Sequence, residues 1–347
     1  GEDRFHVWME ASNGRPAERY WCRVCNRHGL LKYLDHAEQA SPPRTSIDQP
    51  FLGSTPQRAA PCPDHIPFSR QLYEAVALWA HAWLLDPCHP DARAYLLRRG
   101  LSDATIRRAV LGVTLNDADS LVSYLRKTCP DAVPYAEEAG LVVADAQGRL
   151  VTHWHLRGRI VFPYIADGAV VDLRTRTYGN GKGYRSLGPY RERGADFPFA
   201  WDEVQPGTRT VIITEAEFKA LAALQAFHAG ELDAPTLGQP GLTVFRPSWA
   251  HELARKGVTD VVLCYDSQPR PLRNGLPSLA PEEQWSLRHG ATCAAAGLQV
   301  RIARLPLSPG ATKAEIDTFI PQVGAAAFQQ VIATAPLLDD YHRSIEH

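Results

Sequence analysis

The sequence predicts a multidomain protein of α/β and α+β type, in which a parallel sheet flanked by helices follows a mixed region of helices and hairpins. Three observations lead to this fold class. After position 207, β-prone runs alternate with helical runs, an order typical of parallel sheets. Residues 150–177 show short β-rich runs broken at Ala166-Asp167-Gly168, which indicate a hairpin. A chain of 347 residues with 45% hydrophobic content can also bury more than one core.

The elements are expected in the following order. Apolar residues at helical spacing predict a helix over 70–85 and another from Asp91 to Gly100. Ser102 is the expected N-cap of a short helix that stops at Gly112. Beyond Gly207 we expect strands at 209–214, 242–245, 258–265 and 298–305, separated by helices at 215–229, 248–256 and 280–296. Residues 41–66 are crowded with Pro, Ser and Thr and indicate a linker or irregular loop.

Composition limits the function classes. A formal net charge of −1 argues against indiscriminate binding of polyanions, so a nucleic-acid site has to be a local concentration of charge. Seven cysteines, an odd number in a long chain, indicate thiols or metal ligands rather than a disulfide framework. No apolar run approaches the roughly 18 residues that cross a bilayer, and the start is not signal-like. We therefore expect a cytoplasmic protein without membrane contact.

Acidic residues follow three of the predicted elements. Glu215 and Glu217 come directly after the strand at 209–214, Asp266 follows the next strongly apolar strand, and Glu315 and Asp317 follow the last one. In open α/β sheets, functional groups gather at the carboxyl ends of strands, and carboxylate oxygens suit Mg²⁺ or Mn²⁺. The alternative is structural: each acid could favour a helix N-terminus or cap a turn.

The region between Trp154 and Arg193 is basic. Its eight Lys and Arg residues are opposed by only three acids, which makes it a candidate track for a nucleic-acid strand and a triphosphate. Alternation along one strand should place Arg174 and Arg176 on the same face, and Tyr178 and Tyr184 could stack on bases. The alternative is an ordinary solvated hairpin. The basic residues are Arg157, Arg159, Arg174, Arg176, Lys182, Arg185, Arg191 and Arg193.

The N-terminal region contains half of a candidate zinc site. Cys22 and Cys25 form a Cys-x-x-Cys knuckle flanked by aromatic residues, which is a common half of such a site. Cys62 and His65 have the spacing needed for the other half, and the long loop between the two pairs is tolerable for chain entropy.

Four groups of motifs resemble the catalytic core of bacterial DnaG-type DNA primases, whose metal-binding half is a TOPRIM domain. The first is "ARAYLLRRGLSDATIRRAVLGVT", and the second is "GRIVFPYIADGAVVDLRTRT" continued by "GKGYRSLGP". The third, "VIITEAEFKALAAL", resembles the first TOPRIM motif, and "VVLCYDS" and "KAEIDTFI" occupy its second and third acidic positions. The resemblance covers residues from about 91 to 335 and implies the primase-core fold.

This resemblance implies roles for the acids. Glu215 corresponds to the invariant TOPRIM glutamate, Asp266 to the first aspartate of an Asp-x-Asp pair, and Glu315 and Asp317 to the remaining acids. It implies a primase that copies single-stranded DNA into short primers from nucleoside triphosphates, with Mg²⁺ or Mn²⁺ on these acids. Divalent ions suit such a reaction because they stabilise the entering and leaving oxygens at phosphorus.

The chain departs from the family pattern at two positions. Gln268 stands where the second aspartate of Asp-x-Asp is usual, and Lys219 stands where another acid is usual. Glu217 is expected to compensate in part. Lys219 lies one helical turn beyond Glu215, where its ammonium could pair with that carboxylate or contact a phosphate. This variant looks more like TOPRIM domains of phage and mobile-element replication proteins.

The resemblance also gives the predicted segments their names. We expect a partial zinc ribbon at 1–40, a linker and helix at 41–90, a basic primase-core subdomain at 91–206, a TOPRIM domain at 207–310, and the third acidic motif with C-terminal helices at 311–347. The second knuckle of primase zinc ribbons follows a first one, so the partner of Cys22 and Cys25 is expected either before Gly1 or at Cys62 and His65.

Partners and alternatives follow from the same comparison. The 347 residues contain no Gly-x-x-x-x-Gly-Lys-[Ser/Thr] loop, so a helicase would act in trans or lie beyond the chain ends. One alternative function is a binding module for single-stranded nucleic acid in a replication or defence complex, in which the missing acids have weakened catalysis. A second is a TOPRIM nuclease, because the same acids support phosphodiester cleavage.

Overall fold

The computed structural model describes residues 5–12, 15–22, 28–30, 68–87, 90–178, 183–187, 196–273 and 276–346, with the backbone alone for those before residue 68 and for 273, 276, 277 and 346. The chain forms two compact units, Gly1–Gln57 and Arg58–His347. In the first unit, β1 (Phe5–Ser12), β2 (Arg15–Cys22) and β3 (His28–Leu30) form an antiparallel sheet in the order β1-β2-β3.

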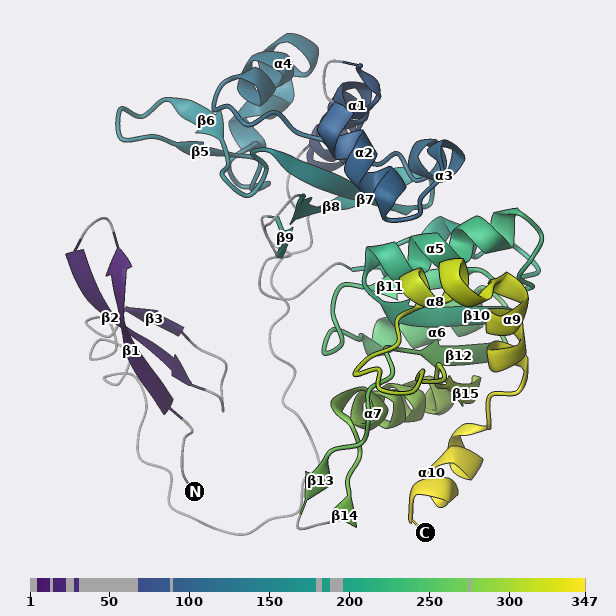
Figure 1. The fold of residues 1–347 in the computed structure, drawn as a ribbon. Helices are drawn as coiled ribbons and strands as arrows, with labels where there is room; N and C mark the ends of the chain where they lie inside the picture. Colours follow the sequence, from purple (N-terminus) through teal and green to yellow (C-terminus); the bar gives the residue numbers. More distant parts are fainter. Residues whose placement is uncertain are drawn as a thin grey trace. The chain divides into compact units, whose positions relative to one another are not determined.

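The first half of the second unit is an antiparallel sheet packed against helices (Figure 1). The sheet has the order β4-β7-β8-β9, and α1 packs on β4 and β8. The elements are α1 (Ser69–Leu85), α2 (Pro90–Arg98), α3 (Asp103–Arg108), β4 (Gly112–Val113), α4 (Ser120–Thr128), β5 (Val142–Ala144), β6 (Leu150–Thr152), β7 (Arg159–Ala166), β8 (Ala169–Thr177) and β9 (Tyr184–Ser186).

Two local predictions in this half are confirmed. Ser102 is the N-cap of α3, because its side chain accepts a hydrogen bond from the Thr105 N–H at 3.2 Å. Asp167 and Gly168 form the two-residue turn between β7 and β8, with φ values of 53° and 75°. Positive φ at both positions matches the twist of the two strands, which is why an Asp-Gly pair occurs there.

The second half of this unit contains the predicted parallel sheet (Figure 1). Its strand order is β11-β10-β12-β15, and every neighbouring pair is parallel. The strands are β10 (Thr210–Glu215), β11 (Thr236–Gln239), β12 (Asp260–Cys264) and β15 (Gln299–Ala303). The helices are α5 (Glu217–His228), α6 (Pro247–Arg255), α7 (Pro281–Ala295), α8 (Ile316–Val323), α9 (Ala325–Ala333) and α10 (Leu338–Glu346), and β13 (Leu272–Arg273) pairs with β14 (Leu276–Pro277).

Helices cover both faces of the parallel sheet, because alternate strand residues point to opposite sides. Val261 and Leu263 of β12 belong to the cluster that contains Leu253 of α6. Val262, between them, belongs to the cluster that contains Phe319 of α8. Strands buried on both faces require nearly continuous apolar runs, as the sequence of β10 and β12 shows.

The predicted strand at 242–245 is wrong. The strand in this part of the chain is β11, Thr236–Gln239, which pairs with β10 in the register Ile212↔Thr236 to Glu215↔Gln239. Gly238 suits this position, because a Cβ atom there would lie 2.9 Å from the Ala216 carbonyl oxygen. The small residue Gly238 therefore indicates the position of this buried strand better than the β-propensity of the Leu-Thr-Val-Phe run does.

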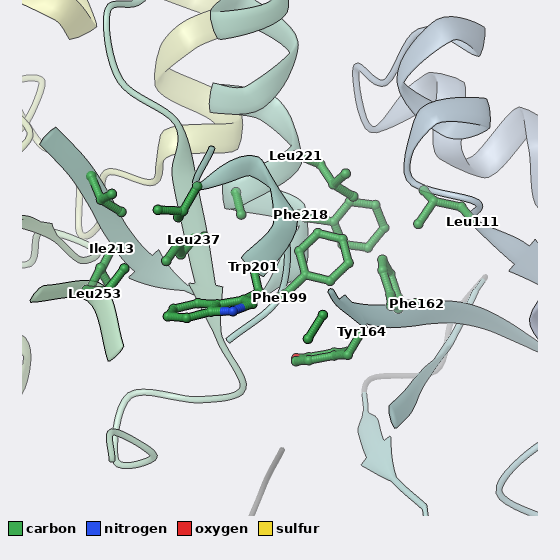
Figure 2. Close-up of a cluster of buried hydrophobic side chains, with 14 of the residues drawn as sticks. Leu111, Phe162, Tyr164, Phe199, Trp201, Ile213, Phe218, Leu221, Leu237 and Leu253 are labelled. Atoms are coloured by element: carbon green, nitrogen blue, oxygen red, sulfur yellow. The ribbon is translucent and has the colours of Figure 1, made fainter. Parts of the chain in front are cut away.

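One hydrophobic core joins the two halves of the second unit (Figure 2). Phe162 of β7 packs against Phe218 of α5 with ring centroids 5.3 Å apart, and against Phe199 at 6.3 Å. Trp201 and Leu237 belong to the same buried cluster. The antiparallel and parallel sheets are thus fixed together by apolar packing. Within the described part of the chain, no helix is both long enough and apolar enough to span a membrane.

Candidate active site

The site is built at the carboxyl ends of β10 and β12, which are neighbours in the parallel sheet. Glu215 is the last residue of β10, and Asp266 follows the end of β12. Burial raises the pKa of Glu215, an effect that nearby Lys219 opposes and nearby Asp266 reinforces. The two acids predicted from strand ends therefore lie within electrostatic reach of each other.

The turn between Glu215 and α5 is strained. Ala216 has φ of 66° and ψ of 161°, a backbone region that residues with a Cβ atom seldom occupy. Its N–H donates to the Gln239 carbonyl at 2.8 Å, so the pairing of β11 with β10 holds this conformation. The Glu215 carboxylate in turn accepts a hydrogen bond from the Leu242 N–H. Backbone contacts thus fix the position of this acid.

Two lysines bind Asp266. Lys219 Nζ lies 2.7 Å from Asp266 Oδ1 and 2.8 Å from Oδ2, and Lys313 Nζ lies 2.6 Å from Oδ2. The Asp266 side chain is 4% exposed and that of Lys219 is 9% exposed, so water screens this pair little. The pKa of Lys313 is raised because hydrogen bonds to Asp266 and Glu315 outweigh the opposing effect of burial.

Glu315 joins the same cluster through a backbone bridge. Ser267 and Ala314 exchange N–H···O hydrogen bonds of 2.9 and 2.8 Å, which hold the segment before α8 against the end of β12. Lys313 Nζ lies 2.7 Å from Glu315 Oε1, and Lys219 Nζ lies 3.5 Å from it. The pKa of Glu315 is lowered, because the hydrogen bond from Lys313 and the charge of Lys219 outweigh the opposing effect of burial.

Asp317 and Glu217 have other partners. Asp317, in the first turn of α8, forms an ion pair with Arg99, and its pKa is raised by burial against the opposing charge of Arg99. Glu217 is fully buried, accepts a hydrogen bond from the Tyr164 hydroxyl at 2.7 Å, and pairs with Arg174 at 2.7 Å. The expectation that Glu217 compensates for the missing acids is wrong, because its carboxylate is committed to Arg174.

The basic residues have unequal exposure. Arg159 and Arg174 are buried, and burial lowers the pKa of Arg159 to about 10. Arg174 and Arg176 lie on the same face of β8, as predicted, with their guanidinium carbons 4.9 and 4.8 Å from the Tyr184 ring centroid. Tyr184 therefore stacks on arginines in this structure. Arg185 is exposed and Arg157 is half-buried.

Gln268 is exposed, and both of its backbone polar groups bond to residues outside the acidic cluster. Its N–H donates to Glu282 Oε1 at 2.8 Å and its carbonyl accepts from Arg304 at 2.8 Å. A groove of about 770 Å³ adjoins the cluster, with Lys313 and Glu315 among its lining residues. Among the described residues, no three Asp, Glu, His or Cys side chains form a group that could hold a metal ion.

The side chains of the candidate zinc ligands and three of the predicted basic residues lie outside the described part of the chain. Cys22 is the last residue of β2, and its side chain is not described. Cys25, Cys62, His65, Lys182, Arg191 and Arg193 lie outside the described residues. The zinc site therefore stays a prediction.

Sequence reasoning missed Lys313 as a member of the cluster. Its signal is the alternation Lys313-Ala314-Glu315, since alternate residues of an extended segment lie on one side. The bridge at Ala314 gives the segment this extended form and presents both charged groups to Asp266.

Comparisons with known proteins agree with this geometry. Residues 80–186 match the family described as DNA primase catalytic core, N-terminal domain. The fold is similar to that of the Aquifex aeolicus primase (zinc binding and RNA polymerase domains), with a TM-score of 0.63, 16% identity, and coverage of 97% of this chain and 80% of that one.

Two further structures are similar. The DnaG primase catalytic domain bound to single-stranded DNA has a TM-score of 0.62 and 20% identity over 79% of this chain and 84% of that one. The Escherichia coli primase catalytic core has a TM-score of 0.60 and 20% identity over 79% and 81%. No curated protein matches the chain.

Proposed function

We propose that the chain carries the catalytic core of a DNA primase, a nucleotidyltransferase, and that it joins nucleotides into short primers on single-stranded DNA at the cluster around Glu215 and Asp266. The observation that carries this proposal is the placement of these two acids at the carboxyl ends of adjacent parallel strands. Binding sites in open parallel sheets lie at this edge.

Glu215 and Asp266 are the proposed ligands of one Mg²⁺ or Mn²⁺. Asp266 Oδ1 is buried and accepts no hydrogen bond from the described residues, although Lys219 Nζ lies 2.7 Å from it. Glu215 has no ion pair among the described residues, and both acids offer the hard oxygens these ions prefer. When bound, the ion neutralises charge that develops on phosphate oxygens. Among the described residues no third Asp, Glu, His or Cys completes a metal-binding group with them, so the proposal is limited to a single ion.

The chain's own residues do the remaining positioning. Lys313 lines the groove and can bind a phosphate of the incoming nucleoside triphosphate as a point charge. Arg185, Arg157 and Arg176 are the predicted basic residues that keep some exposure, so we propose that they contact the template backbone. Arg159 and Arg174 are buried and support that surface from within.

The test is primer synthesis on single-stranded DNA with labelled nucleotides and Mg²⁺ or Mn²⁺. Glu215→Gln and Asp266→Asn remove a charge at nearly constant shape, and each should lower product on the order of 100-fold. Glu231→Gln, an exposed acid on the loop after α5, is the matched control and should keep full activity. Primer synthesis that persists in both site variants would exclude this assignment. Cleavage of the template without primers would indicate a nuclease instead.

The remaining partners are proposals that rest on the sequence. Cys22 and Cys25 are proposed zinc ligands, completed by Cys62 and His65, and the zinc content of the purified protein tests this. A helicase is proposed to act in trans. The Aquifex aeolicus structure named above includes a zinc-binding domain, which supports the zinc proposal.

A further inference from the structure

The acidic cluster contains cations that belong to the chain itself. Lys219 reaches Asp266 from α5, and Lys313 reaches it from the segment before α8. Both ammonium groups also approach Glu315, at 3.5 and 2.7 Å. Two positive groups from separate elements therefore face the same two carboxylates.

The charge balance of the cluster follows from these contacts. Glu215, Asp266 and Glu315 carry three negative charges, and the two lysines place two positive charges within 2.6–3.5 Å of Asp266 and Glu315. A divalent ion near three carboxylates without lysines would meet three negative charges. Here it meets a net charge of −1. The two ammonium groups lie almost as close to the carboxylate oxygens as a bound metal ion would. They therefore cancel most of the electrostatic attraction that the acids would exert on a second ion.

We propose that the ammonium groups of Lys219 and Lys313 are resident cations of this site, which take the place of a divalent ion and leave room for only one. The proposal rests on the assignment of the site made above. The number of bound ions and their affinity can be measured separately from primer synthesis. A two-ion site needs carboxylates that bridge ions roughly 3.5–4 Å apart, and here Asp266 and Glu315 are bridged by ammonium groups instead.

A purely structural role for the lysines makes a different prediction. If they only hold α5 and the segment before α8 together, their removal should loosen the fold without a gain in metal affinity. If they occupy cation positions, removal of either charge should strengthen metal binding, because the freed carboxylate oxygens become available. Lys219→Arg retains the charge and so separates charge from packing.

The experiment measures Mn²⁺ binding by electron paramagnetic resonance on the full chain after treatment with a chelator. Binding that is lost in Asp266→Asn defines the site and removes any contribution from the N-terminal cysteines. The wild type should bind at most one such ion. Lys219→Gln and Lys313→Gln should each bind Mn²⁺ about 10- to 100-fold more tightly or acquire a second ion.

Lys219→Arg and Lys127→Gln, an exposed lysine on α4, should behave like the wild type. Lys313 is 41% exposed, so Lys313→Gln carries the test if Lys219→Gln fails to fold by circular dichroism. The proposal is overturned if the wild type binds two ions that depend on Asp266, or if both Gln variants bind Mn²⁺ with wild-type number and affinity. Neither result decides whether the chain makes primers, because the primer assay measures product and this experiment measures ion binding.

Discussion

Replacement of Glu217 tests the buried ion pair that joins the two sheets. Its carboxylate is fully buried and pairs with Arg174 at 2.7 Å, where the arginine side chain is only 10% exposed. Glu217→Ala leaves that guanidinium without a counter-charge. Arg174 keeps its positive charge when the acid is removed, because a guanidinium stays protonated in proteins.

The size of the effect follows from the geometry. At 2.7 Å and an effective dielectric constant of about 20, the attraction is about 6 kcal/mol before desolvation is subtracted. Removal of one partner of a buried pair typically costs about 3–5 kcal/mol, and we expect Glu217→Ala to fall in this range. The double variant Arg174→Met with Glu217→Leu removes both charges at similar volume and should lie within about 1–2 kcal/mol of the wild type.

Urea unfolding at pH 7, followed by circular dichroism, measures these differences. Asp103→Ala is the control, because the pair between Arg93 and Asp103 is exposed to water, which screens the attraction, so its loss should change stability little. A loss below about 1 kcal/mol in Glu217→Ala, or an equal loss in the single and double variants, would refute the account of this pair.

Three further predictions concern other positions. Gly112→Ala should destabilise by about 1–3 kcal/mol in urea unfolding, since a Cβ atom would lie 2.6 Å from Ala80 Cβ. Burial lowers the pKa of His289 to about 4, so the unfolded state binds its proton at a higher pH than the folded state does. The contribution of His289 to stability should be complete above about pH 6.5 and fall towards pH 4, by about 2–3 kcal/mol at pH 4.5. His289→Gln should reduce this loss. Asp317→Asn should cost about 1–2 kcal/mol, because Arg99 is partly exposed, and should leave Mn²⁺ binding unchanged if Asp317 lies outside the proposed ion site.

The parallel sheet was predictable from sequence because its strands are buried on both faces. Val211 to Ile213 and Val261 to Leu263 are short continuous apolar runs between helical segments, and this pattern has few alternatives. The run at 242–245 has a similar β-propensity but follows Pro240-Gly241. It lies outside the sheet because another segment, β11, pairs with β10. Pairing is a tertiary property, so local propensity does not decide it.

The site was predictable only in part, for a similar reason. The rule that functional groups follow parallel strands led to Glu215 and Asp266 as candidates without any knowledge of their neighbours, and the structure places both at that edge of the sheet. The partners of Glu217 lie 43 and 53 positions away in the sequence, on strands of another sheet. Nothing local to Glu217 distinguishes a metal ligand from the counter-charge of a buried arginine, because both need an ionised carboxylate.

Helix α5 connects the site to the docking of the two halves. Its first turn carries Glu217 and Lys219, which bind Arg174 and Asp266 respectively. Its last turns carry Gln225, whose Oε1 accepts from the Ser102 N–H at 2.7 Å and whose Nε2 donates to the Gly100 carbonyl at 3.1 Å. The first half of the second unit is therefore held at both ends of α5, and the contact through Glu217 lies in the same helical turn as Lys219 of the acidic cluster, so one turn serves both docking and the site.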